Sequence, residues 1–130
     1  MNNPYIPQIG DRLVRRKGIL EHHGIYIGYY NGQHIVAENN PPHGVRYVTY
    51  EGFLDGNNLV RVNRFTGTEL QRKQIIPFIE SKIGTQYNLM NYNCEHFASE
   101  IQNGKPASEQ VQQVALIGIG IVVLAVVLSD

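Results

Sequence analysis

The chain has 130 residues, with 11 Lys and Arg against 11 Asp and Glu, one Cys, and 42% hydrophobic residues. This length fits one domain and is awkward for two. The formal net charge of zero leaves no basic face of the kind that nucleic-acid binding needs. One Cys can form neither an internal disulfide nor a zinc cluster of the C-x-x-C kind. We therefore expect no nucleic-acid partner, no metal and no cofactor, and a thiol that acts as a free thiol.

The first half of the chain has alternating apolar and polar residues, separated by turn-forming residues, as is typical of an antiparallel sheet. Residues 1–10 contain two prolines and end in glycine, which indicates an extended lead-in. The clearest element is the pair Asn31-Gly32 between two β-rich runs, which is the strongest short-range signal for a hairpin. The expected strands are residues 11–17 at a sheet edge, residues 24–30 and 33–39 in the hairpin, and residues 45–50 and 59–65 after it.

The second half of the chain has helical spacing. Residues 68–84 predict a helix, which Pro77 should kink or divide. Residues 94–104 predict another helix, with Asn93 as its N-cap. Strands followed by helices predict an α+β domain, which we place at residues 11–104.

The end of the chain differs in composition, because 14 of its last 20 residues are hydrophobic. Residues 114–128 would form an apolar helix of roughly 22 Å, shorter than the ~30 Å hydrocarbon core of a bilayer. A buried core helix is the alternative. The position of the run and its lack of a polar face favour a membrane anchor that follows a polar linker at residues 105–113. Residues 1–10 do not resemble a secretory signal, so we expect a membrane-associated protein with its catalytic domain in the cytoplasm.

Cys94 is the candidate nucleophile. It occupies the first position of a capped helix, where backbone N–H groups and the helix dipole stabilise a thiolate. The alternative is a small buried residue, because free cysteine is often buried. A nucleophilic cysteine needs a base, and His22 and His23 lie on opposite faces of a strand, so that one of them can face Cys94. His96 should point away on the same helix and pack or form a local hydrogen bond.

Two blocks of sequence, EHHGIYIG at residues 21–28 and NCEHFASEIQNG at residues 93–104, resemble the signature blocks of the lecithin:retinol acyltransferase (LRAT) domain family. That family includes the HRAS-like suppressor phospholipase/acyltransferases and is distantly similar to NlpC-type cysteine peptidases. The resemblance implies a small antiparallel sheet followed by helices, in a permuted NlpC/papain-like arrangement. It also implies that Cys94 is the nucleophile and His22 the base, and that a short apolar C-terminal segment anchors the domain.

The resemblance leaves the third catalytic residue open between His34 and Glu38. Family spacing from the first histidine ends on His34. However, Tyr29 and Tyr30 extend the hairpin here, so the turn lies two residues further out and the equivalent position moves by four residues to Glu38. We favour Glu38, because register is fixed by the turn and a carboxylate can accept a hydrogen bond from the imidazole.

The expected function is that of a thiol-dependent acyltransferase or phospholipase, which transfers an acyl group from a lipid ester through a thioester on Cys94. Its partners would be a lipid acyl donor, an unidentified acyl acceptor and the membrane. A cysteine peptidase or amidase of the NlpC kind is an alternative with the same nucleophile. A non-enzymatic, membrane-tethered interaction module is a further alternative.

Overall fold

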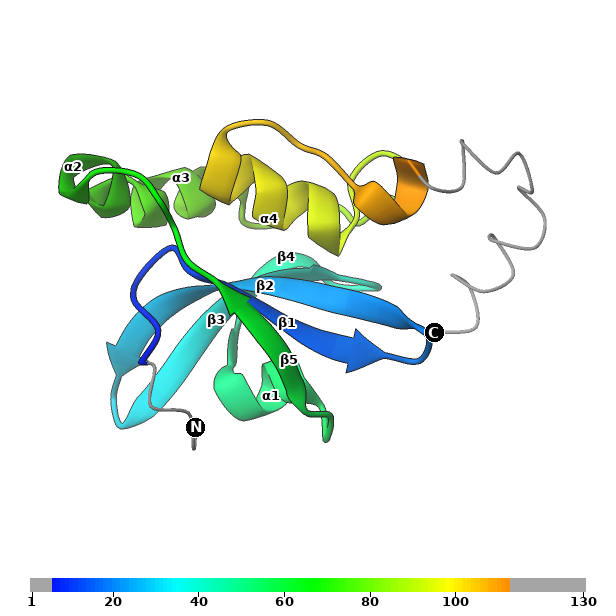
Figure 1. The fold of residues 1–130 in the computed structure, drawn as a ribbon, viewed down its shortest axis with the longest axis horizontal. Helices are drawn as coiled ribbons and strands as arrows, with labels where there is room; N and C mark the ends of the chain where they lie inside the picture. Colours follow the sequence, from blue (N-terminus) through cyan, green and yellow to red (C-terminus); the bar gives the residue numbers. More distant parts are fainter. Residues whose placement is uncertain (1–5, 113–130) are drawn as a thin grey trace.

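The computed structural model describes residues 6–112, which form an antiparallel sheet with helices on both faces (Figure 1). The strands lie in the order β4-β3-β2-β1-β5, and neighbouring strands are antiparallel. The α+β class expected from the sequence is confirmed. The elements are β1 (Arg12–Lys17), β2 (Leu20–Tyr30), β3 (Gln33–Asn40), β4 (Gly44–Thr49), α1 (Tyr50–Leu54), β5 (Leu59–Asn63), α2 (Glu69–Lys73), α3 (Ile75–Lys82) and α4 (Cys94–Asn103).

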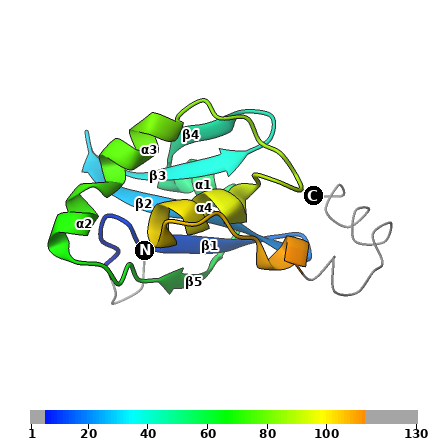
Figure 2. The same ribbon diagram turned by 90° about the horizontal axis from the view of Figure 1, so that it is seen from above.

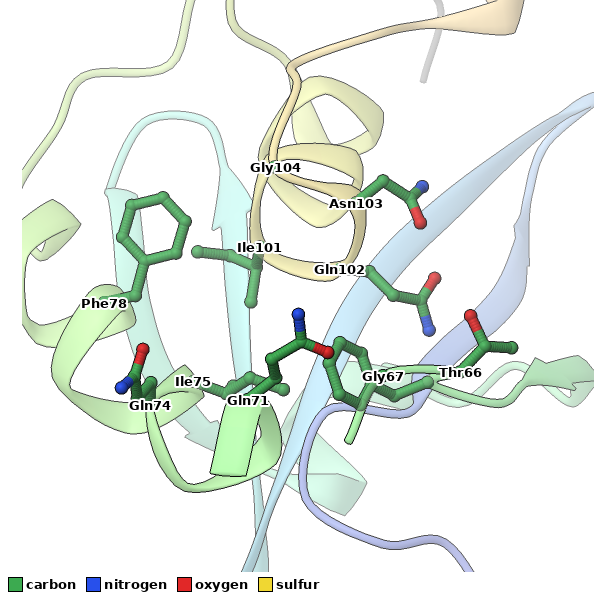
Figure 3. A pocket seen from close by; sticks show the side chains of 11 residues that line it. Thr66, Gly67, Gln71, Gln74, Ile75, Phe78, Ile101, Gln102, Asn103 and Gly104 are labelled. Atoms are coloured by element: carbon green, nitrogen blue, oxygen red, sulfur yellow. The ribbon is translucent and has the colours of Figure 1, made fainter. Parts of the chain in front are cut away.

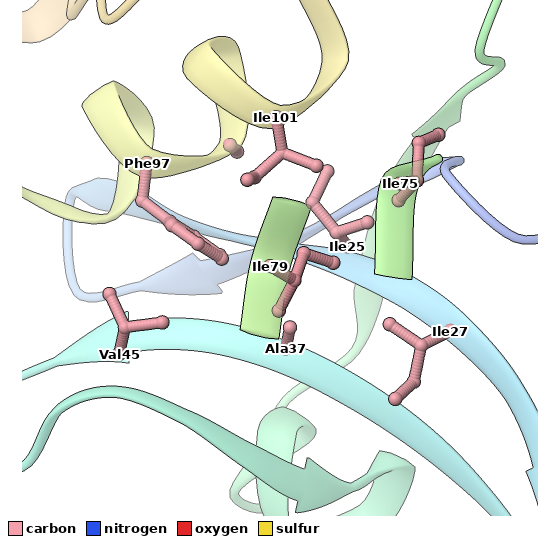
Figure 4. Close-up of a cluster of buried hydrophobic side chains, with 9 residues drawn as sticks. Ile25, Ile27, Ala37, Val45, Ile75, Ile79, Phe97 and Ile101 are labelled. Atoms are coloured by element: carbon pink, nitrogen blue, oxygen red, sulfur yellow. The ribbon is translucent and has the colours of Figure 1, made fainter. Parts of the chain in front are cut away.

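The two faces of the sheet carry separate apolar clusters. Helices α2, α3 and α4 lie on one face and the short α1 lies on the other (Figure 1), and α4 crosses the middle of the sheet along β2 (Figure 2). Burial on both faces explains why residues 22–27 of β2 are all buried. On the α4 side the cluster consists of Ile25, Ile27, Ala37 and Val45 from the sheet with Ile75, Ile79, Phe97, Ala98 and Ile101 from the helices (Figure 4). On the α1 side it consists of Leu13, Tyr26, Val36, Tyr50 and Phe53.

One expectation about the strands is wrong, and another holds with a shift of one residue at each end. β1 does not lie at a sheet edge, because β5 pairs along it and takes the edge position. The strand expected over residues 45–50 ends at Thr49, where α1 begins, so that a helix interrupts the series of strands. The Thr49 hydroxyl accepts a hydrogen bond from the backbone N–H of Gly52 at 3.0 Å. This side-chain cap favours a helical turn over one more residue of strand.

The helix expected over residues 68–84 is divided, as the proline within it indicates. α2 ends at Lys73 and α3 begins at Ile75. Pro77 lacks a backbone N–H, and its ring would collide with the carbonyl group of Lys73 in a continuous helix. The break at residue 74 removes that collision.

The β2–β3 hairpin turns at Asn31-Gly32, as expected. Both residues have positive φ angles, 52° and 80°, which is the conformation of a type I′ turn. The ladder then contains a bulge, because the register shifts between Tyr26 and Gly28 and leaves Ile27 without a partner. Gly28, with a φ of 130°, permits this backbone path.

The bulge decides which face of the sheet carries Glu38. An unbroken ladder from the pair Tyr30–Gln33 would place Glu38 opposite Ile25, on the face of His23. With the bulge, Glu38 lies opposite Gly24 instead. Because side chains alternate along a strand, Glu38 then shares its face with His22.

Part of the expected linker at residues 105–113 packs on the domain. Ser108 is 2% exposed, and its hydroxyl donates to the Glu95 carboxylate at 2.7 Å. The backbone N–H of Gln110 donates to the same carboxylate oxygen at 3.1 Å. The apolar helix expected at residues 114–128 lies outside the described residues. Within residues 6–112 no helix is both long and apolar enough to cross a membrane.

We expect Gly24→Ala to lower the free energy of unfolding by about 1–3 kcal/mol through overpacking. A Cβ atom at this position would lie 2.6 Å from Phe53 Cε1 and 2.7 Å from Val36 Cγ1. Alanine in a strand is otherwise favoured over glycine by roughly 0.5–1 kcal/mol, so a net loss has to come from packing. Urea denaturation of the two proteins measures the difference. An unchanged or higher free energy of unfolding in the variant would contradict the close packing at Gly24.

Candidate active site

The first turn of α4 is closed by a capping box around Cys94. The Asn93 side-chain oxygen accepts hydrogen bonds from the backbone N–H groups of Glu95 at 2.9 Å and His96 at 3.0 Å. In return, His96 Nδ1 accepts a hydrogen bond from the Asn93 N–H at 3.0 Å. The expected helix and N-cap are confirmed, and His96 makes the local hydrogen bond expected of it. Cys94 therefore lies at the positive end of the helix dipole.

The Cys94 thiol lies where β2 and β3 separate. Pairing between these strands stops at Gly24 and Glu38, so the main chain of β2 beyond that point has no partner from β3. Cys94 Sγ is 3.9 Å from the carbonyl oxygen of Glu21, and the nearby backbone of His23 contributes to a lowered pKa of the thiol. The residue is only 6% exposed. The main chain of β2 thus holds the sulfur beside the two histidines.

His22 is held between a carboxylate and an aromatic ring. Its Nε2 is 2.8 Å from Glu38 Oε1, and the two side chains are 0% and 1% exposed. The imidazole stacks on the Phe53 ring with the ring centroids 5.2 Å apart. Its Nδ1 is buried and has no hydrogen-bond partner within residues 6–112. The ring is therefore fixed by Nε2 and by stacking, while Nδ1 is left for another group.

The thiol and the imidazole stabilise each other's charged forms. Burial by itself would raise the pKa of Cys94, but the neighbouring His22 side chain, the His23 backbone and the charge of Lys17 together outweigh burial, so the pKa lies below its usual value. Burial would likewise lower the pKa of His22, but Cys94 and Glu38 together raise it above its usual value. These directions favour a thiolate–imidazolium pair.

Glu38 has a second cationic partner in Arg46. Arg46 Nε donates to Glu38 Oε2 at 3.0 Å, while the other carboxylate oxygen faces His22. Burial would raise the pKa of Glu38, but its hydrogen bonds and charge interactions with His22 and Arg46 lower it. The carboxylate is therefore ionised although it is 1% exposed.

His34 lies in a different part of the hairpin. It pairs with Tyr29 near the turn, with the ring centroids 4.8 Å apart, and its Nδ1 is 2.8 Å from the Tyr26 hydroxyl. It is on the same face of β3 as Glu38 but four residues away, or roughly 13 Å along the strand. The structure thus brings Cys94, His22 and Glu38 together and leaves His34 apart.

His23 belongs to a separate buried polar cluster beneath α4. Its Nε2 is 3.9 Å from the Glu95 carboxylate, and its Nδ1 is 3.4 Å from Arg12 Nη1. Arg12 Nη2 also donates to the Ser99 hydroxyl at 3.0 Å. Burial lowers the pKa of His23 to about 4, so its ring is neutral at pH 7. His22 is therefore the histidine whose side chain lowers the pKa of the thiol, whereas His23 contributes to that shift through its backbone.

Sequence reasoning did not identify Phe53 or Arg46 as parts of this site. Phe53 belongs to α1, which the sequence analysis did not predict, so nothing pointed to an aromatic ring over His22. Arg46 lies directly opposite Glu38 in the β3–β4 ladder. A charged residue within a strand pattern was the available signal, but only the register between β3 and β4 shows which carboxylate it meets.

A cavity of about 630 Å³ lies at the other end of α4 (Figure 3). α4 has ten residues, so its ends are roughly 15 Å apart. The cavity is lined by Phe65, Thr66, Gly67, Gln71, Gln74, Ile75, Phe78, Ile101, Gln102, Asn103 and Gly104.

Within residues 6–112 no three His, Cys, Asp or Glu side chains come together as a metal site.

Comparison with known proteins agrees with the two sequence blocks that meet at this site. The chain matches the family model for lecithin retinol acyltransferase over residues 6–107. It is also 36% identical over 66 residues to mouse phospholipase A and acyltransferase 3, a match that spans 46% of this chain and 41% of the mouse protein. The family match covers more than half of the chain and includes every strand and helix from β1 to α4. The chain therefore belongs to the lecithin retinol acyltransferase family.

Proposed function

We propose that this chain is a thiol-dependent acyltransferase or phospholipase that acts on the acyl esters of glycerolipids. The observation that carries the proposal is the buried chain of Cys94, His22 and Glu38 at the start of α4. A nucleophile, a base and a group that orients the base are the parts that covalent acyl transfer needs. The family and the printed name of the mouse relative support this class of reaction.

In the first half of the reaction, the Cys94 thiolate attacks the ester carbonyl carbon of the lipid, and a tetrahedral oxyanion forms. The C–O bond to the glycerol oxygen then breaks, and His22 gives the proton on Nδ1 to that oxygen. The products are an acyl thioester on Cys94, a free lipid alcohol and a neutral imidazole. Glu38 keeps Nε2 protonated and the ring oriented throughout.

In the second half, an amine, an alcohol or water attacks the thioester while His22 Nδ1 accepts its proton. Collapse of the intermediate breaks the C–S bond and restores the thiolate–imidazolium pair. The backbone N–H of Cys94 is the proposed donor to the oxyanion, because the Asn93 cap uses those of Glu95 and His96. Water as the acceptor gives a phospholipase, and an amine or alcohol gives an acyltransferase.

The remaining expectations stay predictions. Membrane association through residues 114–128, and with it the cytoplasmic placement of the domain, concerns residues outside the described part of the chain. The permuted NlpC/papain-like arrangement is likewise an inference from the resemblance. An NlpC-type amidase would use the same three side chains, so only the choice of substrate separates it from the proposed enzyme.

Phosphatidylcholine carrying an alkyne-labelled acyl chain should transfer that label to Cys94, because the thioester is an intermediate. Mass spectrometry of the trapped protein locates the label, and its release by neutral hydroxylamine identifies a thioester. Cys94→Ala should carry no label at all. No label from several classes of glycerolipid, with the fold intact, would contradict the proposal. Turnover of peptide amides but not of esters would favour the amidase.

Glu38→Gln should lower kcat by about 10²- to 10⁴-fold, since a glutamine can hold the wrong tautomer of His22 and cannot stabilise its positive charge. His34→Gln is the matched control, because it makes the same side chain on the same face of β3 and should keep activity within about twofold. Rates of lipid ester cleavage by the two variants measure the difference. The reverse result, with Glu38→Gln active and His34→Gln inactive, would assign the third position to His34.

A further inference from the structure

We propose that Arg46 is a positioning residue of this site, which holds the Glu38 carboxylate charged and aimed at His22 and thereby extends the reactivity of Cys94 to lower pH. The inference rests on the proposed function, because it assigns a fourth member to the same chain of hydrogen bonds. Arg46 acts through Glu38 and His22 and makes no contact with the sulfur.

The register of the sheet builds this arrangement. Glu38 lies directly opposite Arg46 in the β3–β4 ladder and opposite Gly24 in the β2–β3 ladder. His22 is two residues from Gly24, so it is the diagonal neighbour of Glu38 on the same face. The carboxylate thus lies between two cations, with His22 Nε2 at 2.8 Å on one oxygen and Arg46 Nε at 3.0 Å on the other.

Glu38 needs this second partner because it is almost fully buried. A carboxylate that is 1% exposed loses nearly all of its hydration, and burial disfavours its charged form. When His22 becomes neutral during the reaction, Arg46 is the cation that still balances Glu38. Arg46 is 38% exposed, so it places its charge on the carboxylate without being fully buried itself.

The charges along the chain give the expected direction of the pH effect. With Cys94 as thiolate and His22 as imidazolium, the formal charges of Arg46, Glu38, His22 and Cys94 add up to zero. Without Arg46 the same state carries a net negative charge in a buried place, so protonation of Glu38 or Cys94 becomes easier. Loss of Arg46 should therefore move the acid limb of Cys94 reactivity to higher pH.

Other groups on this face do not take over the role of Arg46. Lys17 Nζ is 3.4 Å from Asn40 Oδ1. Burial raises the pKa of Cys94, and the charge of Lys17 lowers it by less than His22 and the His23 backbone do. Arg15 Nε donates to the carbonyl oxygen of Phe53 at 2.6 Å. From α1, Tyr50 packs on this face, and burial raises its pKa, which keeps it neutral. Each of these groups is unchanged in the variants below.

The rate of alkylation of Cys94 by iodoacetamide, measured against pH, tests the proposal without any lipid substrate. Cys94 is the only cysteine in the sequence, so every modified thiol is this one. The unmodified protein should show a midpoint below the ordinary cysteine value of about 8.5. Arg46→Met should raise this midpoint by about one pH unit, which slows alkylation up to about tenfold at pH values below both midpoints. Arg46→Lys should restore most of the shift.

Arg61→Met is the matched control. Arg61 is 42% exposed, lies on β5 at the opposite edge of the sheet and also binds a carboxylate, that of Glu21 at 2.7 Å, so this variant loses the same charge and a comparable ion pair. Its midpoint should stay within about 0.3 pH units of the parent, because Glu21 does not face His22 through its carboxylate. Equal shifts of the midpoint in Arg46→Met and Arg61→Met would mean that the effect of Arg46 comes only from the net charge of the protein, and would overturn the proposal.

A double-mutant cycle with Glu38→Gln completes the test. If Arg46 acts through Glu38, Arg46→Met should change neither the midpoint nor kcat further in the Glu38→Gln background. In the native background it should lower kcat and leave KM unchanged, whereas a raised KM with an unshifted midpoint would make Arg46 a substrate contact. An ordinary midpoint near 8.5 in the unmodified protein would instead count against the proposed function itself. A low midpoint that Arg46→Met does not move would overturn the positioning role alone.

Discussion

A single unpaired residue, Ile27, determines the geometry of the site. The bulge at this residue shifts the ladder between β2 and β3, so that Glu38 and His22 lie on one face of the sheet. Without it, the carboxylate would face His23 and the polar cluster beneath α4. The bulge changes no side chain of the site. It acts through register, because a shift of one residue moves every following side chain of a strand to the other face.

Once the face is set, electrostatics explains the remaining partners. Glu38 and His22 are both almost fully buried, and a buried charge is tolerated only when it is paired and hydrogen-bonded. Arg46 binds the Glu38 carboxylate at one end of this series of groups, and at the other end the pKa of Cys94 is lowered beside His22, which favours a paired charge there. The same burial that makes an unpaired charge costly also strengthens the attraction between these paired groups. The site is therefore a linear series of alternating charges across β4, β3 and β2 that ends at the start of α4.

α4 joins this series to the rest of the domain. Its first turn holds Cys94 through the Asn93 cap, and its apolar face, with Phe97 and Ile101, packs on the sheet beside α3 (Figure 4). Ser108 and Gln110 bind Glu95 in the same first turn, so the chain after α4 returns to the end of the helix that carries the thiol. A change in the packing of α4 or in this return segment would thus alter the position of the Cys94 thiol.

Elements whose signals are local could be predicted from the sequence alone. The Asn31-Gly32 turn, the Asn93 cap, the division of the helix near Pro77 and the position of Cys94 at a helix start all depend on residues within one turn or one strand. The hairpin extension by Tyr29 and Tyr30 also indicated that residue 38, and not residue 34, lies near His22. The folded arrangement alone sets the face of Glu38, the position of Arg46 opposite it, the stacking of Phe53 on His22 and the place of β1 inside the sheet. These features depend on strand register and on contacts between distant segments. An interior glycine such as Gly28 permits a bulge without requiring one, and the residue pattern of a strand does not show which strand it pairs with. The sequence alone therefore could not predict them.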